Sequence, residues 1–421
     1  MLLADWLGRL ETLHPRTVEL GLERVRQVQA TLALAPRFPL ITVAGTNGKG
    51  STCAYLEAML TAAGYRVGLY TSPHLLRYNE RVRVGGREAG DADIVASFEV
   101  VEQARHDVPL TYFEFGTLAA MWHFLRAGVD VAVLEVGLGG RLDAVNAFDA
   151  DAAIVTTVDL DHMDYLGPDR EAIGFEKAGV YRAGRPAVCA DPAPPASLLR
   201  HARAIGADLR LLGRDWRIEA AAGAWRWQGR EGVCEALPRP LLAGDYQLNN
   251  AGAALAALMA MEKTLPVPRQ AVVQGLLQAR LAGRFQQVAA APDIYLDVAH
   301  NPQAARALAA NLAAWPGRGR TLAVAAMLAD KDRAGVLEAL APRVHEWFLA
   351  DLGGARGGQS QALGEVLAQV LPAARTSLYR QPALALAAAL GRARRDDRIV
   401  VFGSFRTVAA VLEAHPEWQL S

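Results

Sequence analysis

A glycine-rich segment at residues 45–51, Gly-Thr-Asn-Gly-Lys-Gly-Ser, is the first candidate for chemistry in this chain. It follows the apolar run 40–44 and leads into a helix-length segment. Glycines permit backbone angles that aim several N–H groups at one anion, and a helix N-terminus and a lysine ammonium add positive potential. The segment predicts a phosphate-binding loop; the alternative is a turn without a ligand. Because Gly50 follows Lys49, the Walker A pattern is broken, and Ser51 need not take the usual magnesium-binding role.

Lysine is rare in this chain, since only four of its 44 lysines and arginines are lysines. Three of them, Lys49, Lys177 and Lys331, lie in segments with candidate chemistry. An arginine-biased chain keeps lysine where a compact ammonium or a reactive primary amine is needed, because a guanidinium is planar and always charged. Lys263 needs no functional role, since a cation is favourable at the end of a predicted helix. For Lys331, contact with a substrate and pairing with its acidic neighbours both remain open.

Three polar residues near strand ends are candidates for binding a metal ion. Glu135 lies at the end of an apolar run that predicts a strand. Because the carboxyl ends of parallel strands flank the ligand crevice of a sheet, its carboxylate is able to face nucleotide-bound Mg²⁺. Helix capping or a salt bridge is an equal alternative for it. Ser72 offers a hydroxyl oxygen or forms a turn before Pro73. His162 lies in an acidic loop, although a lone histidine is more often structural and Mg²⁺ prefers oxygen.

Another group of polar residues suits the remainder of a nucleotide. Arg284 has a planar donor fork for phosphate, and the alternative is a salt bridge in a hinge. Asp297 is able to accept hydrogen bonds from a ribose, and the alternative is a turn at a strand end. Asn249 and Asn250 lie near the start of a predicted helix, where asparagine also serves as a cap.

Short apolar runs alternate with helix-length segments, which is the pattern of parallel strands joined by helical crossovers. The first alternation predicts strands and helices at 40–44, 51–63, 67–70, 116–126, 131–136 and 152–158. A second alternation predicts them at 294–298, 303–314, 321–326, 333–340, 347–350 and 399–402. Between them, 216–218 and 225–227 predict a small hairpin, and 246–261 predicts a helix. The expected fold class is α/β.

The length of 421 residues exceeds a comfortable single core, so more than one domain is expected. A glycine-containing stretch followed by Gln, Ala and Pro marks a boundary near residues 280–290. We expect a nucleotide-binding domain over 1–283, a hinge over 284–290 and a second domain over 291–421. Interfaces between domains are favoured ligand sites.

The formal net charge is zero and no Lys/Arg block dominates one region, so charge gives no reason to expect a nucleic-acid or membrane partner. The three cysteines are far apart and lack metal spacing, which is typical of reduced, buried thiols. The chain has no signal-peptide pattern at its start and no apolar stretch long enough to span a bilayer. We therefore expect a cytoplasmic protein.

The phosphate loop Gly45-Thr46-Asn47-Gly48-Lys49-Gly50 resembles that of folylpolyglutamate synthases and of the related Mur ligases. Further segments extend the resemblance over nearly the whole chain: Thr71-Ser72-Pro73-His74, residues 134–143, Asp161-His162, Glu176-Lys177-Ala178-Gly179, Gly283-Arg284-Phe285, residues 297–302 and Phe402-Gly403-Ser404-Phe405. The resemblance implies a P-loop-containing Mur-ligase-like N-terminal domain with a mainly parallel sheet. It also implies a smaller Rossmann-like α/β C-terminal domain.

The resemblance assigns roles to individual residues. It implies that ATP phosphates are bound by Thr46, Asn47, Gly48, Lys49, Gly50 and Ser51, and the rest of the nucleotide by Asn250 (or Asn249), Arg284 and Asp297. It implies that Mg²⁺, as two ions, is bound by Ser72, Glu135 and His162. Lys177 is expected to be N6-carboxylated, which requires a neutral primary amine; an exposed helical lysine paired with a carboxylate is the alternative. The expected catalytic residues are Lys49, Lys177, His300 and Ser404. His300 and Ser404 would orient the incoming L-glutamate; a capped helix start and a tight turn are their alternatives.

Three segments resemble the pterin-binding regions of bifunctional members of the family. Their expected substrate contacts are Thr17, Val18, Glu19, Leu20, Thr111, Tyr112, Phe113, Glu114, Leu142, Asp143 and Ala144. An aromatic, carboxylate-bearing pocket suits a flat heterocycle with donor groups. Taken singly, an amphipathic helix and an aromatic core stripe explain these segments as well. Together with the ligase motifs they imply both dihydrofolate synthase and folylpolyglutamate synthase activity.

The implied reaction is ATP-dependent addition of L-glutamate to dihydropteroate and to reduced folates through an acyl phosphate, by a monomer. A monofunctional folylpolyglutamate synthase is the near alternative, because subtle pocket differences separate the two. A Mur-type peptidoglycan ligase is disfavoured, since no UDP-sugar-binding domain precedes the phosphate loop at residue 45. A nucleotide-dependent switch without ligase activity is the alternative from another class of protein.

Overall fold

The computed structural model describes residues 1–16, 18–221, 223–314, 319–354 and 356–419. The chain divides into two compact units. The first comprises Met1–Leu241 and Gln247–Ala279, and the second comprises Leu242–Tyr246 and Arg280–Ser421. Residues 284–290, expected to form a hinge, lie within the second unit. Four of them form strand β12 (Gln286–Ala289), because their backbone pairs antiparallel with the next strand.

The first unit is built on an eight-stranded sheet in the order β4-β3-β2-β5-β1-β6-β7-β8. Its strands are β1 (Leu40–Ala44), β2 (Val67–Tyr70), β3 (Val82–Val84), β4 (Arg87–Glu88), β5 (Val131–Glu135), β6 (Ala152–Val155), β7 (Pro186–Cys189) and β8 (Asp208–Leu211). The neighbours from β2 to β8 pair parallel, whereas β3 and β4 add antiparallel pairs at one side. The loops after β1, β2, β5 and β6 therefore meet at one edge of the sheet.

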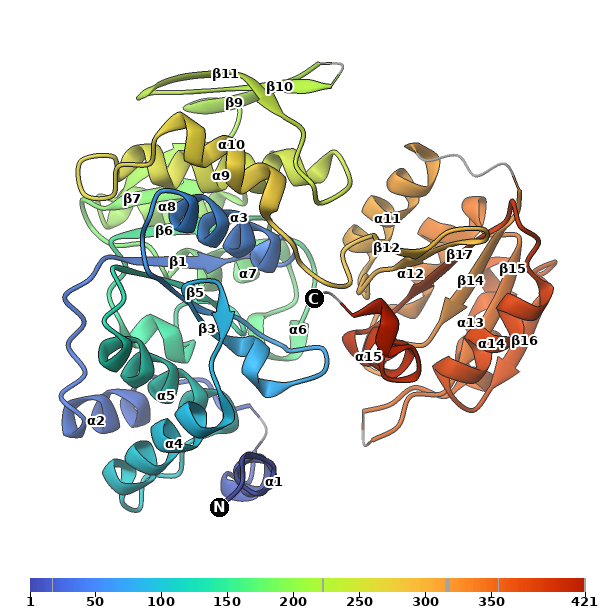
Figure 1. The fold of residues 1–421 in the computed structure, drawn as a ribbon, viewed down its shortest axis with the longest axis horizontal. Helices are drawn as coiled ribbons and strands as arrows, with labels where there is room; N and C mark the ends of the chain where they lie inside the picture. Colours follow the sequence, from blue (N-terminus) through green and yellow to red (C-terminus); the bar gives the residue numbers. More distant parts are fainter. Residues whose placement is uncertain (17, 222, 315–318, 355, 420–421) are drawn as a thin grey trace. The chain divides into compact units, whose positions relative to one another are not determined.

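Helices cover both faces of this sheet, and every residue of β1 and β5 is buried, as parallel sheets require. Helix α3 with α9 and α10 covers one face, and α2, α4 and α5 lie on the other (Figure 1). The helices are α1 (Leu3–Leu13), α2 (Glu23–Thr31), α3 (Lys49–Ala62), α4 (Asp91–Arg105), α5 (Tyr112–Ala127), α6 (Met163–Leu166), α7 (Arg170–Ala178), α8 (Ala196–Ala204), α9 (Tyr246–Ala260) and α10 (Arg269–Gln278), with 3-10 turns η1 (Tyr78–Arg81) and η2 (Ala144–Ala147).

A three-stranded antiparallel sheet is also part of the first unit. It contains β9 (Trp216–Ala220), β10 (Ala224–Gly229) and β11 (Gly232–Pro238), so the expected hairpin has a third strand that the sequence did not predict. Three tryptophans are buried where this sheet packs, and the indole N–H of Trp227 donates a 3.1 Å hydrogen bond to the Gly252 carbonyl of α9. A Cβ on Gly252 would meet the Trp216 ring at 2.8 Å. The small sheet thus packs directly on the backbone of α9.

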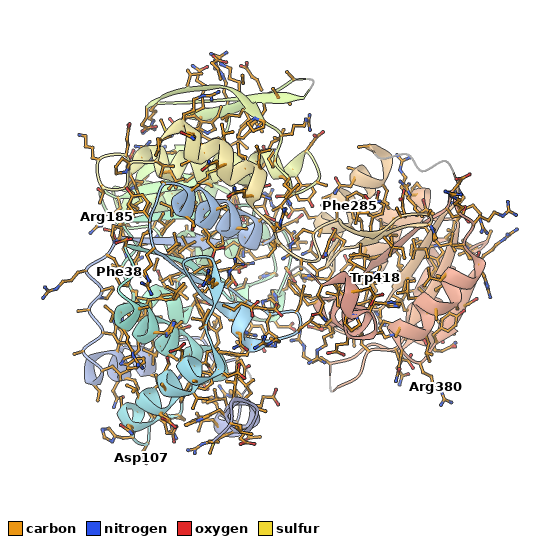
Figure 2. All side chains as sticks on the ribbon, viewed as in Figure 1. Phe38, Asp107, Arg185, Phe285, Arg380 and Trp418 are labelled. Carbon is orange, nitrogen blue, oxygen red and sulfur yellow. The ribbon has the colours of Figure 1, made fainter. Side chains whose placement is uncertain are left out.

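The second unit has a six-stranded sheet in the order β12-β13-β17-β14-β15-β16, parallel except for the β12–β13 pair. Its further strands are β13 (Asp293–Leu296), β14 (Thr321–Ala325), β15 (Glu346–Ala350), β16 (Thr376–Tyr379) and β17 (Arg398–Phe402). Its helices are α11 (Pro302–Ala314), α12 (Arg333–Leu340), α13 (Ser360–Val370), α14 (Pro382–Arg392) and α15 (Phe405–Ala414), with 3-10 turns η3 (Ala341–Arg343) and η4 (Pro416–Trp418). Phe285, labelled in Figure 2, stacks on Tyr295 with ring centroids 4.4 Å apart.

The two alternations expected from the sequence correspond to these two sheets. Several predicted strands extend too far, by as many as three residues at the C-terminal end. The predicted helix 116–126 is longer in the structure, because Thr111 is the N-cap of α5 and the helix begins at residue 112. Within the described part of the chain, no helix combines the length and apolarity needed to cross a bilayer.

Candidate active site

The phosphate loop connects β1 to α3, and two of its glycines have backbone angles that favour glycine. Gly45 has φ 146° and Gly48 has φ 92°. A Cβ on Gly45 would overlap the Thr156 hydroxyl, and a Cβ on Gly48 would overlap the side-chain oxygen of Asn250. The loop therefore fits between the end of β6 and the start of α9 only because these two residues lack side chains.

The segment after β6 holds the loop on one side. The Thr46 N–H donates to the Thr157 carbonyl at 2.7 Å, and the Asn47 N–H donates to the Thr157 hydroxyl at 3.1 Å. The Thr156 hydroxyl donates to the Asn47 carbonyl at 2.7 Å. These hydrogen bonds fix the backbone of the loop before any ligand binds. Sequence analysis missed both threonines, although two hydroxyl residues at the end of a buried strand are a usable signal.

Lys49 is the first residue of α3, and its ammonium folds back over the loop. Its Nζ donates to the carbonyls of Gly45 (3.1 Å) and Thr46 (3.3 Å). The first turn of α3 adds backbone N–H groups that have no partner within the helix. A left-handed glycine, a helix N-terminus and an ammonium at one point fit a polyphosphate.

Helix α9 holds the loop on the other side through a buried amide pair. The Gln247 amide donates to the Ser51 hydroxyl at 3.3 Å, and the Asn250 amide donates to the Gln247 carbonyl oxygen at 3.0 Å. All three side chains are buried. Asn250 lies beside Gly48, whereas Asn249 is half-buried. Gln247 was missed by sequence analysis, although its spacing of three from Asn250 places both on one helical face.

Two of the three expected metal-binding residues are neighbours. Ser72 follows β2 and Glu135 ends β5, and these strands are adjacent in the sheet. The Ser72 N–H donates to the Glu135 carboxylate at 3.1 Å, and Glu135 is 5% exposed. His162 begins α6 with φ 52°, and its ring lies 3.9 Å from the Asp161 carboxylate. The described residues contain no cluster of three or more His, Cys, Asp or Glu able to hold a metal ion. The Ser72 hydroxyl and the Glu135 carboxylate are oxygen ligands of the kind that Mg²⁺ prefers. Phosphate or carbamate oxygens would complete the set of ligands.

Lys177 lies in α7 and is 4% exposed. Burial lowers the pKa of its amine from 10.5 to about 7, and the nearby Lys49 ammonium adds to this, while Asp161 and Asp143 oppose it. The amine is thus substantially neutral near pH 7, and a neutral primary amine is the form that reacts with carbon dioxide. The residues present therefore fit the expected carbamate, which would place an anion near the Lys49 ammonium.

Asp143 organises the loop after β5. Its carboxylate accepts hydrogen bonds from the N–H groups of Leu138 (2.8 Å) and Val145 (3.1 Å), and burial raises its pKa to about 7. The neighbouring Leu142 carbonyl accepts a 3.3 Å hydrogen bond from Gly21. The structure thereby brings the expected substrate segment 142–144, which includes the buried Ala144, next to the one that contains Val18, Glu19 and Leu20. Thr17 lies outside the described residues.

The third expected substrate segment, 111–114, joins the same region through Arg24. Glu114 forms a capping box with Thr111 at the start of α5, and its carboxylate accepts a 2.9 Å hydrogen bond from Arg24. Arg24 also donates to the Glu19 carboxylate at 2.9 Å. Glu114 is therefore engaged by protein groups, and Phe113 packs 5.7 Å from the Tyr70 ring.

A cluster around Arg81 lies beside this segment and was missed by sequence analysis. The Arg81 Nε donates to His74 Nδ1 at 2.8 Å. The guanidinium carbon lies 5.5 Å from the Tyr78 ring centroid and 5.4 Å from that of Tyr112. Burial, with help from the Arg81 charge, lowers the pKa of His74 to about 4, so this histidine is neutral near pH 7. His74 belongs to the motif Thr71-Ser72-Pro73-His74, so part of the cluster was visible in the sequence. No nearby sequence feature linked His74 to Tyr112.

The second unit gathers its own set of expected residues. The buried Asp297 carboxylate accepts hydrogen bonds from the N–H groups of Phe285 (2.9 Å) and Ala299 (2.8 Å), and burial raises its pKa. The Arg284 guanidinium lies 5.1 Å from the Phe405 ring centroid, and the positive charge of Arg284 favours ionised Asp297. Arg284, Asp297 and the start of α15 are thus close together.

His300 and Ser404 belong to the same edge of this second sheet, because β13 and β17 are parallel neighbours. His300 Nδ1 lies 2.9 Å from the Val298 carbonyl, and its ring centroid is 6.3 Å from that of Phe405. Ser404 is buried and caps α15 by accepting a 3.2 Å hydrogen bond from the Arg406 N–H. Lys331 lies before α12, whose N-cap is Asp332.

The fold and these sites define a class of ligases. Residues 43–186 match the Mur ligase middle domain, and residues 283–405 match the domain described as "Mur ligase, glutamate ligase domain". The dihydrofolate synthase/folylpolyglutamate synthase of Escherichia coli (strain K12) is 48% identical over 412 residues, which cover 98% of this chain and 95% of that relative. The chain belongs to the dihydrofolate synthase/folylpolyglutamate synthase family, which confirms the family and the fold class expected from the motifs.

Solved structures of relatives agree over nearly the full length. E. coli FolC in complex with DHPP and ADP has a TM-score of 0.94 and 47% identity, covering 98% of this chain and 97% of that chain. A bifunctional folylpolyglutamate synthase/dihydrofolate synthase with Mn, AMPPNP and L-glutamate bound has a TM-score of 0.90 and 48% identity, covering 98% of both chains.

Proposed function

We propose that this chain is an ATP-dependent ligase that joins L-glutamate to dihydropteroate, forming dihydrofolate, and to reduced folates, forming folylpolyglutamates. The observation that carries the proposal is the agreement with bifunctional relatives over 98% of the chain at 48% identity. The phosphate loop with Lys49 folded over it supports the use of ATP.

Amide formation from a carboxylate requires activation, because oxide is a poor leaving group. We infer that an acceptor carboxylate oxygen attacks the γ-phosphorus of ATP, so that a new P–O bond forms, ADP leaves and an acyl phosphate results. The amino group of L-glutamate then attacks the acyl carbon, phosphate leaves with its bonding electrons, and the nitrogen loses a proton. Lys49 and the N–H groups of residues 48–51 would stabilise charge on the transferred phosphoryl group.

The remaining roles are proposals that rest on the geometry within each unit. Ser72, Glu135 and His162, with a carbamate on Lys177, would hold Mg²⁺, which supplies charge neutralisation at the phosphates when bound. Asn250, Arg284 and Asp297 would contact the nucleotide. His300 and Ser404 would orient L-glutamate. The segments 18–20, 111–114 and 142–144 would bind the pterin end of the acceptor, and their mutual contacts support this role.

Phosphate release from ATP tests the proposal against its alternatives. We expect release that requires both L-glutamate and a pteroate or folate acceptor. Release that ignores both substrates would identify a nucleotide-dependent switch instead of a ligase. Turnover with a reduced folate but not with dihydropteroate would identify a monofunctional folylpolyglutamate synthase.

We further propose that the chain acts as a cytoplasmic monomer, without a nucleic-acid or membrane partner. The formal net charge of zero supports the part of this proposal that concerns nucleic-acid and membrane partners. Sedimentation equilibrium tests the monomeric state, and a mass of twice the chain mass would contradict it.

A further inference from the structure

Val158, the third residue after β6, has both of its backbone polar groups bound by one ion pair. Its N–H donates to the Asp191 carboxylate at 2.7 Å, and its carbonyl accepts a 2.8 Å hydrogen bond from Arg170 Nε. A terminal amino group of Arg170 lies 3.3 Å from the same carboxylate. Asp191 is 3% exposed, and a carboxylate buried to this extent requires partners of this kind.

The same ion pair binds Ala193, in the loop after β7, in the same way. The Ala193 N–H donates to Asp191 at 2.8 Å, and its carbonyl accepts a 3.0 Å hydrogen bond from a terminal amino group of Arg170. Strands β6 and β7 are parallel neighbours, so both loops leave the sheet at the edge where the phosphate loop follows β1. The loop after β6 is therefore fixed to the neighbouring loop at Val158.

The two residues that flank Val158 in the chain are those that hold Thr46 of the phosphate loop. The Thr157 carbonyl accepts a 2.7 Å hydrogen bond from the Thr46 N–H. The Asp159 N–H donates to the Thr46 hydroxyl at 3.0 Å, and this hydroxyl donates to the Asp159 carbonyl at 3.1 Å. A displacement of Val158 would therefore move both anchors of Thr46 at once.

Arg170 also connects this loop to the helix that carries Lys177. It is the first residue of α7, and Lys177 lies seven residues further along the helix. Seven residues make about two helical turns, so both residues lie on one face of α7. The ion pair thus ties the N-terminal end of α7 to the loop that holds Thr46.

We propose that Arg170 and Asp191 are positioning residues for nucleotide binding, which act through Val158 to hold the phosphate loop in its binding conformation. This inference rests on the proposed function, in which ATP occupies that loop. In metal sites, the loss of such an outer partner typically costs about 10- to 100-fold in affinity or activity, and we expect a change of that size here.

Calorimetric titration of the full-length protein with ADP tests the inference. Asp191→Asn keeps the shape of the side chain, but its amide nitrogen is a donor facing other donors, so the Kd for ADP should rise about 10- to 100-fold. Arg170→Met, at a side chain that is 41% exposed, should also raise the Kd. In turnover, the KM for ATP should rise in both variants and the KM for L-glutamate should not. A smaller fraction of folded protein would leave both KM values unchanged.

Asp397→Asn is the matched control, because Asp397 forms a similar buried pair with Arg320 in the second unit. Asp397 is also 3% exposed, and it pairs with the Arg320 guanidinium at 2.7 Å. It accepts hydrogen bonds from the N–H groups of Arg320 (2.7 Å) and Arg394 (2.9 Å). Asp397 precedes β17, whereas Ser404 follows that strand, so the two lie at opposite edges of the sheet. This variant should lose thermal stability, as Asp191→Asn does, but bind ADP with wild-type affinity.

Wild-type affinity for ADP in either Asp191→Asn or Arg170→Met would overturn the inference. An equal loss of ADP affinity in Asp397→Asn would also overturn it, because the effect would then follow from lowered stability alone. A wild-type protein that binds ADP but forms no glutamylated product would contradict the proposed function itself, so the two failures are distinguishable.

Discussion

Asn250 lies directly against Gly48 of the phosphate loop, so close that a Cβ on Gly48 would overlap the Asn250 side-chain oxygen. Gly48 has φ 92° and is the N-cap of α3, while Asn250 belongs to α9. The same amide reaches Ser51 through Gln247. The shape of the phosphate loop is therefore set by a helix that lies far away in the sequence.

Gly48→Ala should abolish nucleotide binding, because the new Cβ both strains the backbone and displaces Asn250. Gly64→Ala is the matched control, since Gly64 has φ 94° but a Cβ there would meet nothing within 4 Å. Both variants should lose about 1–2 kcal/mol of unfolding free energy from the backbone alone, because an L-residue is disfavoured at these positive φ angles. Calorimetric titration with ADP should show wild-type affinity for Gly64→Ala and loss of affinity for Gly48→Ala. Equal ADP affinity in the two variants would refute the role of this contact.

Gln247→Leu should weaken ATP binding, since it leaves the Ser51 hydroxyl and the Asn250 amide without their buried partner. An unsatisfied buried polar group costs about 1–3 kcal/mol, so we expect a KM for ATP raised about 5- to 100-fold together with a lower midpoint of thermal unfolding. Ser97→Ala, which removes a buried hydroxyl bonded to the Asp93 carbonyl of α4, should lower stability without changing the KM for ATP. A normal KM for ATP in Gln247→Leu would show that the amide pair is structural only.

The local part of this site was predictable from sequence, and the long-range part was not. The phosphate loop is encoded by seven consecutive residues between a strand and a helix, so its position could be predicted. The contact of Gly48 with Asn250 and the packing of Arg81 against Tyr112 join residues whose proximity depends on the finished fold. Strand β11 escaped prediction because only one of its seven residues is buried and its sequence carries little apolar alternation.

Lys177 should carry a carbamate at neutral pH. Its lowered pKa of about 7 makes the neutral amine available, and conversion to an anion relieves repulsion by Lys49. A sample equilibrated with ¹³C-bicarbonate should show a carbamate carbon resonance that is absent from Lys177→Met and retained in Lys263→Met. If the wild type and Lys177→Met give identical spectra, the proposed modification is wrong.

The same lysine should make stability depend on pH when carbon dioxide is excluded. Between its folded pKa of about 7 and its ordinary value of 10.5, the unfolded state binds more protons than the folded state. Stability contributed by this group therefore rises as the pH increases through this window and is lowest below pH 7. Lys177→Met should be more stable than the wild type near pH 6, and the difference should shrink toward about pH 10. A difference that does not change with pH would contradict burial of the free amine.

The most direct test of the central claim is identification of the products by mass. Purified protein is supplied with ATP, Mg²⁺, L-glutamate and either dihydropteroate or a reduced monoglutamyl folate. We predict that each acceptor gains one glutamyl residue, with ADP and phosphate formed in equal amounts. Hydrolysis of ATP without a glutamylated product from either acceptor would contradict the account.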